Sequence, residues 1–166
     1  GKDVLYPLYT QLGAEHFVLG KYADARAALE KATSLAPEVS VAYEQLFLVQ
    51  NAMNDYKAAR SSIKKALEYN SANPQSWIQR LTLEATEYKM SNQDVNAQYE
   101  AARVKTNNAP VLINAYGLAL EKDGQYEKSY EILREALLAD QTNKKYLEDL
   151  DRVSITLQRR AIERAG

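Results

Sequence analysis

Small and large hydrophobic residues recur along this chain at a nearly constant interval. One set, spaced for a single helix face, returns 34 residues later: Tyr22, Ala25, Leu29 and Ala32, then Tyr56, Ala59, Ile63 and Ala66. The last three positions return twice more, as Val95, Tyr99 and Ala102 and as Ser129, Leu133 and Ala136. A fixed period of this length indicates one supersecondary unit stacked several times.

Each unit holds two hydrophobic stretches of helical period with a turn between them. In the first unit, Leu8 and Leu12 begin one such face, Gly20 interrupts the pattern, and Pro37 follows the end of the second face. The pattern predicts four helical hairpins, over residues 6–39, 40–73, 74–109 and 110–143. The third is two residues longer than the others, so we expect a longer first helix or a bulged turn around residues 87–93.

A last helical stretch, over residues 144–164, has no partner helix. Its inward face is apolar and is formed by Tyr146, Leu147, Leu150, Val153, Leu157 and Ala161. Stacked arrays need a terminal helix with a polar outer side, and this stretch carries several charged residues there. We therefore expect a capping helix. An alternative is that a second stripe, Ile155 and Ile162, contacts a partner or another copy of the chain.

The aligned positions resemble the tetratricopeptide repeat (TPR). A large residue stands near the start of each first helix, at Tyr9, Tyr43, Trp77 and Ile113. The Leu-Gly pair of that helix is Leu12-Gly13, with Tyr116-Gly117 as a weaker match, whereas Phe47 and Leu81 replace the glycine in the second and third units. The resemblance covers residues 6–143. It implies an all-α fold: a right-handed α-solenoid of four helical hairpins plus a C-terminal capping helix, in a single domain over residues 1–166.

The first helices of this family line a concave groove. The resemblance therefore places the partner-binding residues at Thr10, Ala14, Phe17, Val18, Glu44, Leu48, Asn51, Ile78, Thr82, Thr86, Asn114, Leu118, Glu121 and Lys122. The apolar members suit a partner helix or an extended apolar segment. We expect a non-enzymatic protein–protein interaction module that holds a partner protein or peptide in this groove. An alternative is that some of these residues are core, or are covered by the chain's own C-terminal part.

Composition narrows the chemistry. The chain has 21 basic and 22 acidic side chains and a net charge of -1, which does not favour nucleic-acid binding. It has no cysteine and one histidine, His16, so the usual zinc ligand sets and cysteine chemistry are excluded. We find no catalytic motif and no phosphate-binding loop, and we expect no catalytic residue, no metal site, no cofactor and no direct insertion into a membrane.

Two alternatives to the groove hypothesis stay open. Twelve tyrosines would suit a glycan-handling TPR module, as in bacterial exopolysaccharide export systems, although the repeat frame assigns most of them to packing. The C-terminal helix would suit a self-assembling TPR scaffold. The sequence opens at Gly1 without a methionine, so we expect a domain excised from a longer protein. It does not separate a cytoplasmic from a periplasmic location.

Overall fold

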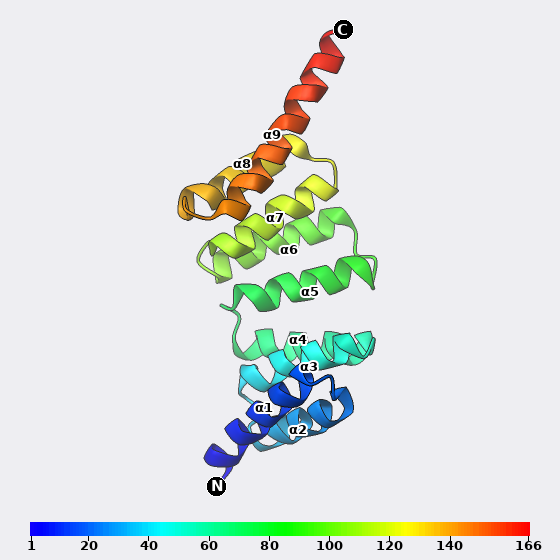
Figure 1. Cartoon of the computed structure of the whole chain (residues 1–166), viewed down its shortest axis with the longest axis vertical. Helices are drawn as coiled ribbons and strands as arrows, with labels where there is room; N and C mark the ends of the chain where they lie inside the picture. The colour runs from blue at the N-terminus through cyan, green and yellow to red at the C-terminus, as the bar shows by residue number, and fades with distance from the viewer. The chain divides into compact units, whose positions relative to one another are not determined.

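The computed structural model describes all 166 residues and contains nine α-helices and no strand (Figure 1). The helices are α1 (Lys2–Val18), α2 (Tyr22–Leu35), α3 (Ser40–Ala52), α4 (Tyr56–Tyr69), α5 (Pro74–Thr86), α6 (Asn92–Lys105), α7 (Pro110–Lys122), α8 (Tyr126–Ala139) and α9 (Lys144–Ala165). They fall at the predicted hairpins and at the predicted terminal helix, so the all-α fold class is confirmed. No helix combines the length and the hydrophobicity that a membrane crossing requires.

The chain forms two compact units, Gly1–Leu83 (unit 1) and Glu84–Gly166 (unit 2). The boundary between them falls inside α5, between Leu83 and Glu84. The expectation of a single domain over residues 1–166 stays a prediction, and each unit is described by itself below.

The turns inside the hairpins explain why the third repeat is longer. Three of these turns have three residues, 19–21, 53–55 and 123–125, and each contains one residue with a positive φ, which is Gly20, Asn54 or Gly124. Glycine and asparagine accept this left-handed conformation at low cost. The turn between α5 and α6 spans residues 87–91, while α5 has the same 13 residues as α3 and α7. The two extra residues therefore lie in the turn, as one of the two expectations had it.

Unit 1 is built around small residues at a helix crossing. A Cβ atom added to Gly13 of α1 would lie only 2.4 Å from Cγ of Leu29 in α2, so these helices touch where glycine stands. Leu29 belongs to a buried cluster with Ala25, Leu46 and Val49. A second buried cluster contains Phe47, Ala59, Ile63, Ala66 and Leu83. Phe47 occupies the position of Gly13 in the second repeat and is buried there rather than projecting into solvent.

Unit 2 repeats the same crossing and adds the terminal helix. A Cβ at Gly117 of α7 would lie 2.5 Å from Cδ2 of Leu133 in α8, and the Ser129 hydroxyl donates a 2.7 Å hydrogen bond to the Gly117 carbonyl. Helix α9 packs against α8 and α7 through a face that includes buried Tyr146 and Val153. Most other residues of α9 are exposed, which agrees with a capping helix.

Candidate functional site

All predicted groove residues of unit 1 are at least partly accessible. They are Thr10, Ala14, Phe17 and Val18 on α1, Glu44, Leu48 and Asn51 on α3, and Ile78 and Thr82 on α5. Helices α1 and α3 are in contact, so two of the three contributing helices adjoin directly. Phe17 and Leu48 also pack against the two buried clusters, and the Phe17 ring contacts that of Tyr22 at 5.6 Å between centroids. These two side chains therefore serve the core as well as the surface.

The most exposed apolar residue among those predicted, Val18, belongs to an apolar hollow of about 430 Å³ on α1. This α1 hollow is lined by Gln11, Ala14, Glu15, Val18 and Leu19. Val18 is 84% exposed and Leu19 is 67% exposed, and the Gln11 amide donates a 3.0 Å hydrogen bond to Glu15 at the rim. Ala14 and Val18 were predicted from the repeat frame. The spacing of three and four residues could have added Gln11, Glu15 and Leu19, which stand on the same helix face.

Helix α9 contacts two of the five predicted residues of unit 2. Asn114 is buried, and its amide donates a 3.2 Å hydrogen bond to Asp149 of α9. Arg152 of α9 donates two hydrogen bonds, of 2.8 and 2.7 Å, to the carboxylate of Glu121. The other three residues, Thr86, Leu118 and Lys122, are partly or fully exposed. For Asn114 and Glu121 the structure thus shows cover by the C-terminal part of the chain.

Asp149 is the centre of the polar contacts between α9 and α7. Its carboxylate is buried and also accepts hydrogen bonds from Lys145 at 3.1 Å and Arg152 at 2.9 Å. Burial by itself would raise the pKa of Asp149, but the hydrogen bonds from these two cations and from Asn114 outweigh it and lower the pKa. The network therefore holds Asp149 ionised and fixes α9 on α7.

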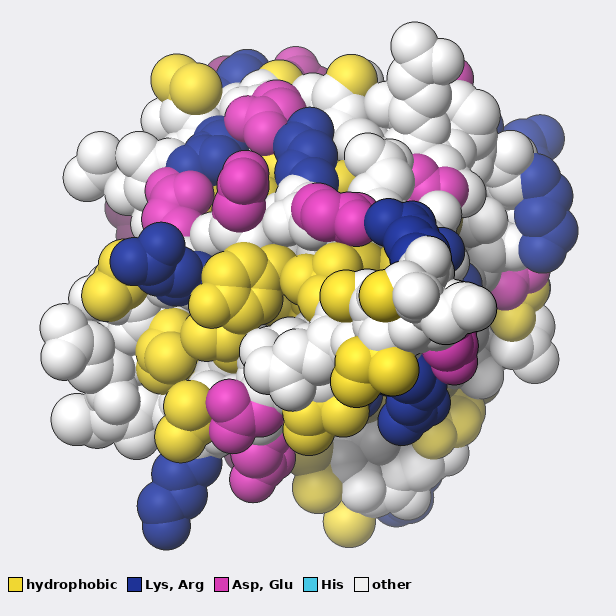
Figure 2. All heavy atoms as spheres, turned by 90° about the horizontal axis from the view of Figure 1, so that it is seen from above, with side chains coloured by type: hydrophobic (Ala, Val, Ile, Leu, Met, Phe, Trp, Pro, Cys, Tyr) yellow, Lys and Arg dark blue, Asp and Glu magenta, His cyan; other side chains and the backbone are white.

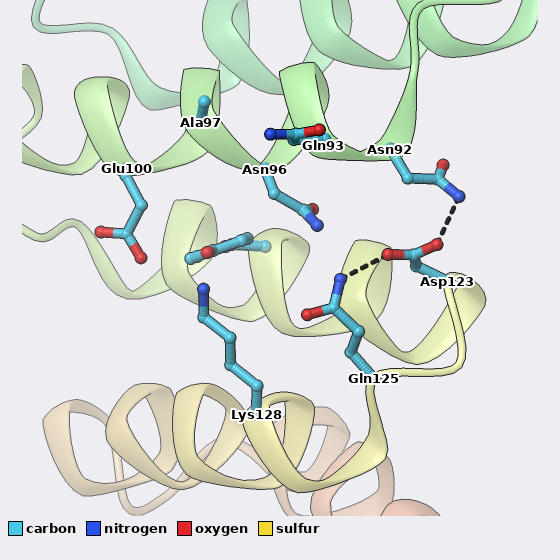
Figure 3. Close-up of a pocket in the computed structure, with 9 residues that line it drawn as sticks. Asn92, Gln93, Asn96, Ala97, Glu100, Asp123, Gln125 and Lys128 are labelled. Carbon is cyan, nitrogen blue, oxygen red and sulfur yellow. Dashed lines mark hydrogen bonds between the residues drawn. The ribbon is translucent and has the colours of Figure 1, made fainter.

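Unit 2 also contains a polar groove that the sequence did not predict. Its volume is about 510 Å³, and it is lined by Asn92, Gln93, Asn96, Ala97 and Glu100 of α6, Tyr116 of α7, Asp123 and Gln125 of the following turn, and Lys128 of α8 (Figure 3). Tyr116 lies about 200° around α7 from both Asn114 and Leu118, at about 100° per residue. The polar groove is therefore distinct from the predicted concave groove.

One carboxylate organises the open end of the polar groove. The Asn92 amide donates a hydrogen bond to Oδ1 of Asp123, and the Gln125 amide donates one to Oδ2 of the same residue. Figure 3 shows these two bonds, with Asn96 and Glu100 extending from α6 and Lys128 approaching from α8. Asp123 accordingly fixes two carboxamides, one on either side of the groove, through their N–H groups.

Tyr116 lies beneath the polar groove and is fully buried. One face of its ring stacks on Tyr99, with 5.3 Å between the centroids, and the ammonium of Lys128 lies 5.6 Å from the ring centroid. Its hydroxyl is buried without a hydrogen bond of normal geometry. Burial raises the pKa of Tyr116, while the nearby Lys128 lowers it and Glu100 raises it. The hydroxyl is thus a buried polar group that interacts with Lys128 and Glu100 but has no hydrogen bond of normal geometry.

Two other features of the surface are His16 and a set of exposed apolar side chains on α8 and α9. His16, the single histidine, is partly buried at the end of α1, and its Nδ1 atom has no hydrogen-bond partner. Figure 2 shows hydrophobic side chains gathered among acidic and basic ones on the face seen from above, the end at which α9 is drawn in Figure 1. Exposed apolar residues of α8 and α9 are Leu138, Leu147, Ile155 and Ile162.

The comparisons with known structures show the fold. A structure of pilF from Pseudomonas aeruginosa superimposes with a TM-score of 0.78 at 17% identity, covering 96% of this chain and 72% of that one. TTC0263, a thermophilic TPR protein of Thermus thermophilus, gives 0.69 at 16% identity, covering 92% and 82%. YrrB, described as a TPR protein with an unusual peptide-binding site, gives 0.63 at 15% identity, covering 90% and 76%. No curated protein matches the sequence.

Family models identify the repeats directly. Two models described as tetratricopeptide repeat match residues 6–39, 42–73 and 112–143. These ranges coincide with the first, second and fourth predicted hairpins to within two residues and together cover more than half of the 166 residues. The structural likenesses extend over the remaining hairpin as well. The chain therefore belongs to the tetratricopeptide repeat family.

Proposed function

We propose that this chain is a non-enzymatic interaction module that binds a partner protein segment through its first helices, with the α1 hollow as the anchoring surface of unit 1. Family membership supports the general role, because tetratricopeptide repeats are scaffolds for protein–protein interaction. The α1 hollow supports the particular place. It joins two of the residues assigned from the repeat frame, Ala14 and Val18, into one apolar surface.

The exposure of Val18 is the observation that carries the proposal. The Val18 side chain is 84% exposed beside the apolar Leu19, so burying it against a partner would lower the free energy of the complex. Neighbouring Gln11 and Glu15 give the hollow a polar rim on one side. An apolar surface with a polar edge fits the apolar face of an amphipathic helix or an extended apolar segment. Phe17 and Leu48 would extend the contact only through the parts of their side chains that the core leaves free.

The test compares two valines in matched surroundings. Val18 is the last residue of α1, and Val104 is the next to last residue of α6. Val104 is 78% exposed and lines neither the α1 hollow nor the polar groove. Lysine is compatible with the C-terminal end of a helix, so both Val18→Lys and Val104→Lys should change the free energy of unfolding by less than about 0.5 kcal/mol. We expect Val18→Lys to abolish capture of the native partner and Val104→Lys to leave it intact.

A second variant tests the α1 hollow itself. Ala14→Gln adds a longer side chain one turn before Val18, fills the hollow and should act like Val18→Lys. The measurement is the amount of each protein retained from native lysate on immobilised wild type and variants, with unfolding followed by circular dichroism. Unchanged retention on both variants would show that the partner binds elsewhere.

The polar groove does not support the glycan-handling alternative. Sugars bind proteins largely through a free aromatic face, and the single aromatic residue of the polar groove is Tyr116. Its ring is covered by Tyr99 and by Lys128. For the concave groove, Thr86, Leu118 and Lys122 remain proposed partner contacts in unit 2, because their side chains are accessible.

A further inference from the structure

The lining of the polar groove has the regular spacing of a repeating ligand. Asn92, Asn96 and Glu100 follow one another at intervals of four residues along one face of α6. Four residues of α-helix advance by about 6 Å. An extended polypeptide presents main-chain groups to the same side every two residues, or about 6.7 Å. Three successive side chains of α6 can therefore meet three successive same-side main-chain positions.

The chemistry of these side chains also suits peptide groups. A carboxamide both donates and accepts, as the peptide group does, so one Asn can pair with an N–H and a C=O together. Asn96 has no hydrogen-bond partner in the protein and stands in the middle of the series. Asp123 takes up N–H donors of Asn92 and Gln125, which leaves their amide oxygens to accept N–H groups of a ligand.

Tyr116 gives an independent reason to expect an occupant. A buried hydroxyl without a partner is costly and rare in folded proteins. This hydroxyl interacts with Lys128 and Glu100, two residues that line the groove, but neither contact has the geometry of a normal hydrogen bond. Because the hydroxyl is buried, Lys128 or Glu100 would move aside for a carbonyl of a bound main chain to accept its proton. Polar groups that could bind a ligand therefore lie both beneath the groove, at the Tyr116 hydroxyl, and along α6, at the Asn96 carboxamide.

We infer that the polar groove is a second binding site, which takes the main chain of an extended polypeptide of about three or four residues. The volume of about 510 Å³ and the distance of about 12 Å from Asn92 to Glu100 along α6 fit that length. Two carboxylates, Glu100 and Asp123, and one lysine line the groove, which disfavours phosphate and nucleic acid. The covered ring of Tyr116 disfavours sugar. The site lies in unit 2 on the second helices, so it does not rest on the α1 hollow.

The test uses blocked neutral hexapeptides and the full ¹⁵N-labelled chain. Two peptides of unrelated sequence should shift amide resonances of residues 92–100 and 123–128 with similar affinity, because the main chain is read. A third peptide, with alternate amide nitrogens methylated, should bind about tenfold more weakly or not at all. Absence of binding by both unmodified peptides, or equal binding of the methylated one, would overturn the inference.

Two matched pairs of variants locate the contact. Asn96→Leu should weaken peptide binding about tenfold, whereas Gln98→Leu, on the same helix but outside the groove, should leave it unchanged. Tyr116→Phe should also weaken it, whereas Tyr99→Phe should not. Circular dichroism checks that each variant is folded, and the exposed Gln125→Leu replaces Tyr116→Phe if that variant does not fold. A neutral hexasaccharide that shifts the same resonances when the peptides do not would assign the groove to a different ligand class.

Discussion

Replacing Gly117 by alanine should destabilise unit 2 even though alanine is the better helix former. In an open helix the substitution gains about 0.5–1 kcal/mol. Here the added Cβ would lie 2.5 Å from Cδ2 and 2.6 Å from Cγ of Leu133, and 3.3 Å from its backbone nitrogen. Leu133 is fully buried, so shifting its side chain would disturb the packing around it. Overpacking of this kind costs about 1–3 kcal/mol, so the expected net loss of stability is about 1 kcal/mol.

The sign of the effect should reverse when the obstacle is removed. Leu133→Ala alone should cost about 2–5 kcal/mol, because it deletes a buried side chain. In that background the atoms at 2.5 and 2.6 Å are gone, and only the backbone nitrogen at 3.3 Å remains. Gly117→Ala should then stabilise by about 0.5 kcal/mol, which is close to its helix-propensity gain. The double-mutant cycle should therefore give a coupling of about 1.5 kcal/mol between the two positions.

Urea unfolding followed by far-UV circular dichroism measures the four free energies of this cycle. The equivalent pair in unit 1, Gly13 and Leu29, gives a parallel cycle in which the fluorescence of Trp77 serves as an additional probe of that unit. An equal slope of free energy against urea in all variants is needed for the comparison. If Gly117→Ala has the same sign with and without Leu133, close helix approach is not what excludes a side chain at this position.

Two further outcomes follow from α9. Burial alone would raise the pKa of Asp149, but hydrogen bonds from groups that include Lys145 and Arg152 lower it. The ionised carboxylate therefore stabilises the fold above about pH 4, and this contribution is lost as the pH falls through the lowered pKa. Urea unfolding between pH 2 and pH 7 should show a smaller acid loss for Asp149→Asn than for wild type, and an identical loss would contradict this. Ile155 and Ile162 are 55% and 74% exposed and lie seven residues apart on α9. If the chain self-assembles through α9, its mass in sedimentation should rise with concentration, whereas the Ile155→Glu, Ile162→Glu double variant should stay a monomer. A wild-type mass that is constant would eliminate self-assembly.

The hairpins could be predicted because their packing requires particular residue sizes at fixed intervals. Glycine stands where α1 crosses α2 and where α7 crosses α8, and the alanines of the second helices, Ala32, Ala66, Ala102 and Ala136, recur in phase. Spacing alone does not show whether the two extra residues of the third repeat lengthen its first helix or its turn. A local signal was present: Ser91 caps α6 by accepting a 3.1 Å hydrogen bond from the Asp94 amide, the mark of a helix start.

The exposed face of α1 shows a limit of the same reasoning. The spacing of Leu8 and Leu12 predicts an inward helix face, and the equivalent residues of the second hairpin, Ala42 and Leu46, are buried. Leu8 and Leu12 are instead 56% and 41% exposed, because no helix of unit 1 covers them. A residue pattern specifies which side of a helix can pack, whereas burial also needs a neighbour to pack against. The frame therefore predicted the inward positions of inner helices better than those of the first helix.

The polar groove could not be predicted because its residues look unremarkable one at a time. By spacing alone, the solvent side of an amphipathic helix is predicted for Asn92, Asn96 and Glu100. They line a groove only because the turn before α8, and α8 itself, lie opposite them, which the sequence does not reveal. The repeat frame places Tyr116 at a packing position, and its ring does stack on Tyr99. Repeat symmetry predicts the position of the ring but not the surroundings of the hydroxyl. The other first helices have no phenol at this position, where Leu12, Leu46 and Arg80 stand. The one repeat with a phenol at this position is thus also the one with a polar groove above it.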